Sequence, residues 1–312
     1  KDNKPVGRIV SCIDHFYCEH VKKKVGFFGY FESIDDRSIA KKLFQSSEEW
    51  LRQNDMKIMQ GPIDGRIDNG CGFLLKGFDK QQSILSTYFP KYYLTFANQC
   101  DFMKNRDLFT YYIDLTKSLP DQLKQKAQEC KKNGFTVRKF NRLRTGKELK
   151  WWIPFFLETF KDHYGYVPVS REEVVSRYGV KQLRWLVDTD LFLIVEQNNE
   201  PVAYLWATPD YNQIFRSFNG KLGFFELLRF LREKNNITTG KLHLIGIKES
   251  VRRNHVASLL NYEALLMMKK KGYSAAEVGW IDEKNHSAHK TISLTGAKVF
   301  KKHRLFEKKL SG

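Results

Sequence analysis

Two spacings of apolar residues alternate along the chain. Short segments rich in β-branched and aromatic residues predict strands, and apolar residues three or four positions apart predict helices. The predicted strands cover residues 5–13, 25–32, 56–63, 135–140, 191–197, 201–209, 241–249, 274–281 and 298–309. The predicted helices cover residues 38–53, 120–133, 147–163, 171–187, 223–234, 256–272 and 286–294. Strands interleaved with helices predict an α/β layered fold around mixed central sheets.

Turn and cap residues support several of these boundaries. Asn198-Asn199-Glu200 lies between two predicted strands, which is a hairpin signal. Pro120 suits the first turn of a helix, and Gly134 suits the position after its end. Near the N-terminus, Glu19 and the lysines at 22–24 predict a polar turn between the first two strands.

A short pattern occurs twice. The strand end Gly-x-x-Glu-Ser at 29–33 occurs again at 246–250, and each copy is followed by a predicted helix and a further strand. Agreement in element type and spacing predicts a duplicated unit. We place the first unit at residues 1–112 and the second at residues 113–312.

The two copies differ at the start of the helix. Asp35 and Asp36 follow the first copy, and Arg252 and Arg253 follow the second. Free N–H groups and the helix dipole attract phosphate at a helix N-terminus, and arginines strengthen that attraction. We therefore expect any polyanion to bind the second unit, and we expect the aspartates to cap their helix.

Composition limits the class of protein. A chain of 312 residues with 42% hydrophobic and 14% aromatic residues has enough apolar side chains for two globular domains. The five cysteines are odd in number and scattered, which favours a reducing compartment, and no signal-like or membrane-spanning apolar run is present. A cytoplasmic location is expected. The net charge of +18 suits phosphorylated cofactors, nucleic acid or an acidic membrane surface, but also an ordinary solvated surface.

The segment IGIKESVRRNHVASLL (245–260) resembles the acyl-CoA signature of the GNAT (Gcn5-related N-acetyltransferase) superfamily. That signature is Arg/Gln-x-x-Gly-x-Gly/Ala at a helix start, and Arg252, His255 and Ala257 occupy its three defined positions. Asn285-x-x-Ala288 is similar to the motif that opens the next helix of the family, and 298–310 is similar to its final strand. Further segments across nearly the whole chain resemble one bacterial GNAT-related group, whose members are mostly of unassigned function and usually have additional residues at the start. The resemblance implies a first unit that is degenerate and lacks its opening strand and helices.

The resemblance also implies a site for acetyl-CoA, or another acyl-CoA, as co-substrate. Backbone N–H groups from Asn254 to Ser258 would hold its pyrophosphate. The strand that ends at Ile247 would separate from its neighbour, pair with the pantetheine arm and direct an N–H group at the acyl carbonyl. Asn285 would contact the cofactor or orient its helix. The implied cofactor-binding residues are Ile247, Arg252, Arg253, Asn254, His255, Val256, Ala257, Ser258 and Asn285.

Two departures from the family pattern matter. His255 stands where the family has Gly, so it either closes the site or contributes its own N–H. The Tyr that often protonates the leaving thiolate falls near Thr291-Ile292 here, and neither Tyr262 nor His289 nearby has motif support. Glu249 and His243 are the candidate catalytic bases. Their alternatives are a helix cap and a packed or exposed strand residue, respectively.

Other clusters favour structural roles. Cys12, His15, Cys18 and His20 are metal-ligand types, but their spacing lacks the usual pair-loop-pair pattern, and we predict no metal site. The aromatic runs at 27–31 and 88–93 favour core packing over base stacking. A basic cluster at 138–147 favours a solvated surface over RNA binding.

The leading hypothesis is an enzyme that transfers an acyl group, acetyl in the first instance, directly from CoA to an unknown amine acceptor. One alternative is a non-catalytic tandem module, which His255 and the missing Tyr favour. Another is an aminoacyl-tRNA-dependent transferase, which the basic surface allows but nothing in the sequence demands. No membrane partner is expected.

Overall fold

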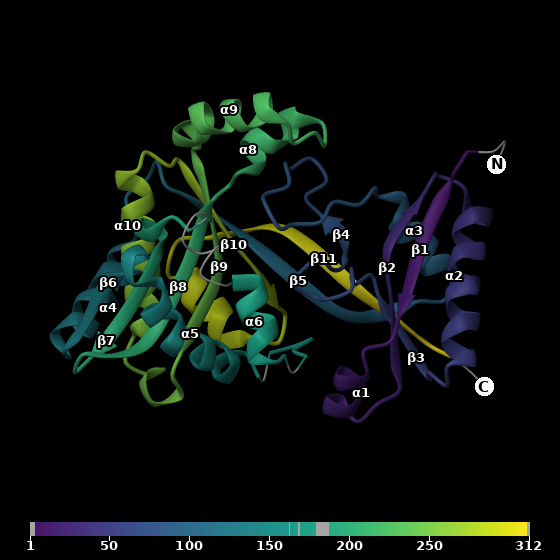
Figure 1. Ribbon diagram of the computed structural model, residues 1–312, viewed down its shortest axis with the longest axis horizontal. Coiled ribbons are helices and arrows are strands. Elements are labelled where there is room, and N and C mark those ends of the chain that lie inside the picture. Colours follow the sequence, from purple (N-terminus) through teal and green to yellow (C-terminus); the bar gives the residue numbers. More distant parts are fainter. Residues whose placement is uncertain (1–3, 162, 168, 179–186, 311–312) are drawn as a thin grey trace.

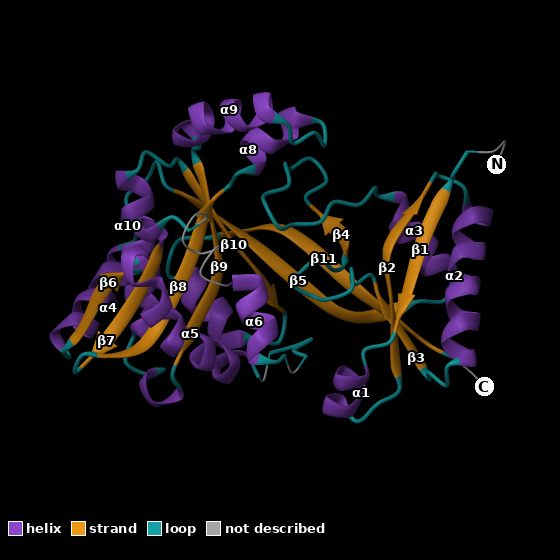
Figure 2. Cartoon of the chain, in the orientation of Figure 1, coloured by secondary structure: helices purple, strands orange, loops and turns teal. Residues whose placement is uncertain are grey.

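One mixed sheet runs through the whole molecule. The computed structural model describes residues 4–161, 163–167, 169–178 and 187–310. Within these residues the strands form one 11-stranded sheet in the order β1-β2-β3-β11-β5-β10-β9-β8-β7-β6, and β4 also pairs with β11. Figures 1 and 2 show helices on the faces of this sheet from one end of the molecule to the other. The predicted layered α/β fold is confirmed, and the sheets of the two predicted units are joined.

Most elements lie where the apolar pattern predicts them, but β4, β5, α1, α3 and α8 were not predicted. The strands are β1 (Gly7–Cys12), β2 (Val25–Ser33), β3 (Ile58–Gly61), β4 (Phe73–Lys76), β5 (Met103–Asp114), β6 (Phe135–Lys139), β7 (Phe192–Gln197), β8 (Glu200–Pro209), β9 (Thr239–Ile247), β10 (Ala275–Asp282) and β11 (Lys298–Lys309). The helices are α1 (His15–Val21), α2 (Arg37–Gln53), α3 (Tyr92–Gln99), α4 (Asp121–Lys132), α5 (Thr145–Phe160), α6 (Arg171–Tyr178), α8 (Asn212–Phe215), α9 (Phe224–Glu233), α10 (Val256–Lys270) and α11 (His286–Ser293).

Several boundaries differ from the prediction. The prediction of a polar turn around Glu19 is wrong, because helix α1 occupies this segment. The side chain of Asp14 caps the start of α1 by accepting from the N–H of Tyr17. The predicted helix at 171–187 begins as α6, and residues 179–186 lie outside the described part of the chain. The hairpin at Asn198 and Asn199 is confirmed, since both have positive φ, as a tight hairpin turn requires.

Both copies of the repeated pattern fold in the same way. In the first copy, β2, α2 and β3 form a unit whose two strands are parallel neighbours. In the second copy, β9, α10 and β10 do the same. Asp36 caps α2 by accepting from the N–H of Ser38, as predicted from its position.

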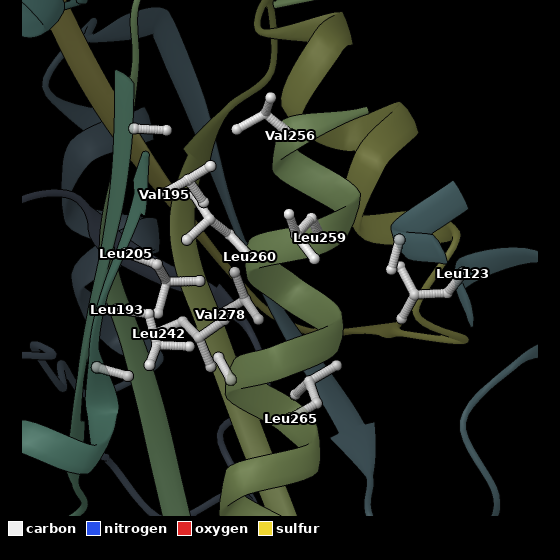
Figure 3. Close-up of a cluster of buried hydrophobic side chains, with 14 of the residues drawn as sticks. Leu123, Leu193, Val195, Leu205, Leu242, Val256, Leu259, Leu260, Leu265 and Val278 are labelled. Atoms are coloured by element: carbon white, nitrogen blue, oxygen red, sulfur yellow. The ribbon is translucent and has the colours of Figure 1, made fainter. Parts of the chain in front are cut away.

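Helix α10 is the centre of the larger core. Figure 3 shows it between the sheet, which contributes Leu205, Leu242 and Val278, and Leu123 of α4 on its other side. Leu259 of α10 is completely buried. Because α10 packs on two layers, the position of its N-terminus relative to β9 is fixed by the core and does not depend on loop conformation.

Strands β5 and β11 connect the two halves. Residues 298–302 of β11 pair with the end of β5, and residues 303–307 pair with its beginning. The last residues of β11 also pair with β3 in the first half, while β5 pairs with β10 in the second half. The predicted boundary at residue 112 therefore falls inside a strand that belongs to both halves, and Figure 1 shows both strands crossing between them.

A buried carboxylate sits where these strands meet. Asp107 of β5 is 1% exposed and accepts from Arg304 at 2.7 and 3.0 Å. Lys302 and Lys104 lie 2.7 and 3.2 Å from the same carboxylate. Burial alone would raise the pKa of Asp107, but hydrogen bonds from these three cations together hold it well below its usual range.

Loss of this carboxylate should destabilise the fold strongly. We expect Asp107→Ala to lower the free energy of unfolding by about 3 kcal/mol, because it leaves partly buried cations without their partner. The measurement is urea unfolding at pH 7. Asp55→Ala is the matched control, since Asp55 also pairs with two lysines, Lys24 and Lys57, but is exposed. Equal effects of the two substitutions would contradict this account.

Candidate active site

The parallel strands β9 and β10 separate halfway along their length. Their pairing begins at Thr239–Ala275 and stops at Leu242–Val278. Beyond that point β9 continues beside β8 as far as Ile247, and β10 continues beside β5 as far as Asp282. Irregular pairing occurs on both outer sides where the separation begins, between β8 and β9 and between β10 and β5. The result is a gap between two strands in the middle of the sheet.

Backbone N–H groups of β9 face this gap. The N–H of Lys248 donates to Val202 O near the beginning of β8. Because successive residues of a strand direct their N–H groups to opposite sides, the N–H of Ile247 points away from β8 and toward β10. Ile247 was predicted to present an N–H group to a ligand here, and its backbone has the orientation which that role requires.

The gap leads to the N-terminus of α10. Among the residues that the structure describes, the N–H groups of His255, Val256, Ala257 and Ser258 have no hydrogen-bond acceptor, and no side chain caps this helix. Unpaired N–H groups at the start of a long helix favour an anion. The first turn of α10 and the loop before it, residues 252–258, are named here the α10 loop.

The α10 loop enters its helix through a residue in left-handed backbone. His255 has φ +60° and ψ +18°, which is the left-handed region that glycine adopts readily. Histidine is among the residues that tolerate this region best. Its ring lies 3.7 Å from Glu129 of α4. The side chain is thus directed at α4, and the bulk of the imidazole does not alter the turn that the signature needs.

The other predicted anion ligands of the α10 loop are accessible. Arg252 and Arg253 are exposed, while Asn254 is half-buried and donates its backbone N–H to Val251 O. The N–H of Asn254 is therefore used within the loop, unlike the four that follow it. Asn285 caps α11 by accepting from the N–H of Ala288 at 3.1 Å. This contact supports its predicted helix-orienting role.

The two candidate bases lie in different places. His243 sits at the irregularity in β9, half-buried, with Nε2 2.6 Å from Thr208 Oγ1. Burial, and secondarily the charge of Lys241, lowers the pKa of His243 to about 3. Glu249 is exposed in a short turn after β9. Six residues of extended chain span about 20 Å, so the two cannot act on the same amine.

A buried charged cluster beside the site was missed from the sequence. Lys301 of β11 lies 3.2 Å from both carboxylate oxygens of Glu277 in β10, which also accepts from Ser83 at 2.8 Å. Lys241 of β9 donates to Ile84 O and to Ser86, both at 2.6 Å. Burial lowers the pKa of Lys241 to about 8. The sequence did contain an indication of this cluster, because Lys241, Glu277 and Lys301 are charged residues within predicted strands.

These contacts place a segment of the first half over the second. Residues 81–87 follow β4 and lie across β9 and β10 through the contacts just described, and Thr87 O lies 3.1 Å from Nε2 of His303 in β11. Asp210, at the end of β8, also accepts from the N–H of Ile84 at 2.7 Å. A small pocket lies at this junction, lined by residues of both halves that include Thr87, Trp280 and His303. Trp280 belongs to the separated end of β10, so this pocket adjoins the gap.

A tyrosine–histidine pair is also present near the gap. Tyr111 Oη lies 2.6 Å from Nδ1 of His289 in α11, whose Nε2 is 3.0 Å from Asp282 O. A carbonyl oxygen only accepts, so Nε2 carries a proton and, in the neutral ring, Nδ1 accepts from the tyrosine hydroxyl. Nothing in the sequence connects these two residues, because Tyr111 falls in the unit assigned to residues 1–112.

The remaining clusters are built into the fold. Phe27, Phe28 and Phe31 are buried, which confirms core packing for these three residues of the run, whereas Tyr30 is 43% exposed. Phe89 and Tyr93 are buried as well. The five cysteines are free, and no group of three or more His, Cys, Asp or Glu residues in the described part of the chain could hold a metal ion. In the basic cluster, Arg138 pairs with Glu148 and Glu196, and Lys139 pairs with Asp190.

Solved structures establish the fold class. The chain superposes over its whole length on a GCN5-related N-acetyltransferase from Sphaerobacter thermophilus, at a TM-score of 0.56, with 12% identity and 79% of that chain covered. A tandem GNAT protein from the clavulanic acid biosynthesis pathway matches 98% of this chain and 80% of its own, at a TM-score of 0.54 and 9% identity. The chain has the fold of the GCN5-related N-acetyltransferases, as the sequence predicted.

Two curated relatives match nearly the whole chain by sequence. Protein YghO of Escherichia coli is 29% identical over 325 residues, which cover 99% of this chain and 80% of YghO. A protein named bacterial ceramide synthase, from Caulobacter vibrioides, is 24% identical over 318 residues, with 99% of this chain and 82% of the relative covered. No protein-family model matches. Among the described residues, no helix is both long and apolar enough to span a membrane.

The left-handed backbone at His255 has a testable consequence. We expect His255→Val to lower the free energy of unfolding by about 2 kcal/mol, because a β-branched side chain is strongly disfavoured at positive φ. His255→Gly should leave it unchanged or slightly increased. Chemical denaturation measures both.

His286 is the matched control position for these substitutions. It is exposed, at the first position of α11 and without positive φ. There, glycine should be the more destabilising of the two substitutions. If glycine and valine ranked in the same order of stability at positions 255 and 286, the explanation from positive φ at His255 would be contradicted.

Proposed function

We propose that this chain is an N-acyltransferase that takes its acyl group, acetyl in the first instance, from acyl-CoA and transfers it to an amine. The observation that carries the proposal is the gap between β9 and β10, which leads directly to the free N–H groups of the α10 loop. A ligand with an extended chain that ends in phosphates fits both the gap and the α10 loop. Backbone amides would pair with the chain, and a helix N-terminus would hold the phosphates.

The residues of the α10 loop would hold the cofactor. The N–H groups of His255 to Ser258 supply donors, and Arg252 and Arg253 supply positive charge. Ile247 supplies a further N–H inside the gap, where it would pair with the extended arm of the cofactor between the phosphates and the acyl group. Bound acyl-CoA would supply an activated thioester, so the protein needs to provide position, an oxyanion donor and a proton acceptor.

His243 is the better candidate for the proton acceptor. It lies at the start of the gap, whereas Glu249 lies at its outer end, beyond Ile247. Its lowered pKa keeps the imidazole neutral at physiological pH, so that Nδ1 is able to accept a proton from the attacking amine while Nε2–H donates to Thr208. The hydroxyl of Thr208 fixes the orientation of the ring through its 2.6 Å contact with Nε2.

Two observations bear on the acceptor. The pocket lined by Thr87, Trp280 and His303 adjoins the gap and lies between the two halves, where substrate pockets are common. The relative named bacterial ceramide synthase has a lipid in its name and matches nearly the whole chain. We therefore favour an amine that carries an apolar chain over a small polar amine. A non-catalytic module is the second candidate function, and it predicts binding without turnover.

Charge reversal at the α10 loop tests the cofactor site. We expect Arg252→Glu to weaken acetyl-CoA and CoA binding at least tenfold, about 1.4 kcal/mol, because it replaces an attractive charge near the phosphates with a repulsive one. Isothermal titration calorimetry measures the affinity. Arg37→Glu is the matched control, since Arg37 begins the corresponding helix of the first half and is exposed. An equal loss in both variants, or no binding by the wild type, would contradict the proposal.

A second test separates the two candidate bases. We expect His243→Gln to lower kcat about 10²–10⁴-fold while the affinity for acyl-CoA is retained. Because His243 is already neutral above pH about 3, the wild-type profile between pH 5 and 9 should show no ionisation that this substitution removes. Glu249→Gln should retain activity. Full activity in His243→Gln together with its loss in Glu249→Gln would transfer the role to Glu249.

A further inference from the structure

Helix α9 and the residue pair before it present an apolar surface to solvent. Large side chains here are exposed to an extent that is unusual for a folded domain. They are Leu222 (85%), Phe224 (68%), Phe225 (80%), Leu227 (55%), Leu228 (48%) and Leu231 (49%). We call these six residues the α9 surface. No residue of α9 is buried.

The exposed side chains share one side of the helix. At 100° per residue, Phe224, Phe225, Leu227, Leu228 and Leu231 fall within a single arc of about 160°. Phe230 lies outside that arc and contacts Tyr211 and Phe215, with ring centroids 5.4 and 5.7 Å away. The outward side is therefore the apolar one. An ordinary surface helix has the opposite arrangement.

The α9 surface is displayed at the periphery of the molecule. Figures 1 and 2 show α9 at one edge, with α8 between it and the sheet. A small cluster of Ile214, Phe218 and Ile237 holds this region together. Helix α9 therefore gains little from packing on the protein. Apart from Phe230, the apolar residues of α9 do not pack in the core.

The charges around the α9 surface select the kind of partner. Residues 215–236 contain five basic and two acidic residues. Both acidic side chains are used locally: Glu226 accepts from the N–H of Gly223, and Glu233 pairs with Arg229. Within the described part of the chain, Lys221, Arg232 and Lys234 have no ion-pair partner. Apolar side chains bordered by free cations are typical of a helix that lies in the interface of an anionic bilayer.

We propose that the α9 surface docks this protein onto an anionic membrane surface. Phe224, Phe225 and the leucines enter the boundary between headgroups and acyl chains, and Lys221, Arg232 and Lys234 contact lipid phosphates. This partner differs from the expectation drawn from the sequence, where no membrane partner was predicted. The inference rests on exposure and charge alone and does not require acyl transfer.

The location of the α9 surface is compatible with the proposed site. Helix α9 is followed by β9, which begins at Thr239 and reaches His243 four residues later, about 13 Å of extended chain. A docked membrane would thus lie near the beginning of β9, a few residues before the point at which the gap begins.

Vesicle flotation with the whole chain tests this inference. We expect the wild type to float with vesicles of phosphatidylcholine and phosphatidylglycerol at 7:3, and to bind pure phosphatidylcholine at least tenfold less. Raising the salt concentration should weaken the binding. Phe224→Ser combined with Phe225→Ser should reduce the bound fraction at least tenfold. Neither side chain is buried, so the variant is expected to fold, and circular dichroism and thermal unfolding check that it does.

Phe16→Ser combined with Leu143→Ser is the matched control, since these side chains are 67% and 92% exposed elsewhere on the molecule. This control should bind vesicles like the wild type. The proposal is overturned if the wild type does not bind anionic vesicles, or if the control and the α9 variant lose binding equally. It is also overturned if light scattering shows that the α9 surface is covered by a second copy, as a dimer that Phe224→Ser and Phe225→Ser dissociate. Acetyl-CoA titration of the same samples reports independently on the proposed acyl-CoA site.

Discussion

The pairing of β5 with β11 is the interaction on which the rest of the structure depends. These are the two longest strands, and they pair from one end to the other. One end of the pair continues the sheet through β3, and the other continues it through β10. The buried carboxylate of Asp107 concentrates three cations at the middle of this pair. Both halves are therefore held in one register by a single ladder of hydrogen bonds.

The candidate site follows from a constraint on neighbouring strands. Strand β10 is paired with β5 on one side, and β9 is paired with β8 on the other. When two central strands part, their inner backbone groups lose their partners, and such groups need a ligand or water. The core around α10 keeps the strands and the helix start in fixed relation. The protein thus maintains unpaired donors along the gap and at the helix N-terminus, and these donors match an extended ligand that ends in phosphates.

The sequence predicted those features that local chemistry determines. The turn at Asn198 and Asn199, the cap at Asp36 and most strand and helix periods depend on neighbours in the chain, and these were found. Strands β4 and β5 and helices α3 and α8 were not predicted, since β4 has only four residues and β5 begins with the mostly polar sequence MKNRD. The left-handed backbone at His255 was not predicted either. Helix α1 was missed because its short sequence, HFYCEHV, mixes polar and apolar residues without a clear period.

Long-range contacts could not be predicted in this way. Tyr111 meets His289, and Lys241 meets residues 84–86, only because β5 and β11 bring distant segments together. Nothing within a few residues of these side chains indicates the partner. Similarly, the apolar residues of α9 predicted a helix correctly, but their period is the same whether the apolar side faces a core or the solvent. Which side of α9 faces the solvent depends on Phe230, which packs against the cluster of Ile214, Phe218 and Ile237.

The segment at 81–87 has a consequence for how the chain could be divided. It covers Lys241, Glu277 and Lys301, which are 2%, 5% and 0% exposed, and all three belong to the second half. A fragment without the first half would bring three charges and the edges of β5 and β11 into contact with water, and it would leave Phe306 without the aromatic neighbours that cover it. Division of the chain between its halves would therefore expose charged groups and strand edges that the intact molecule keeps covered.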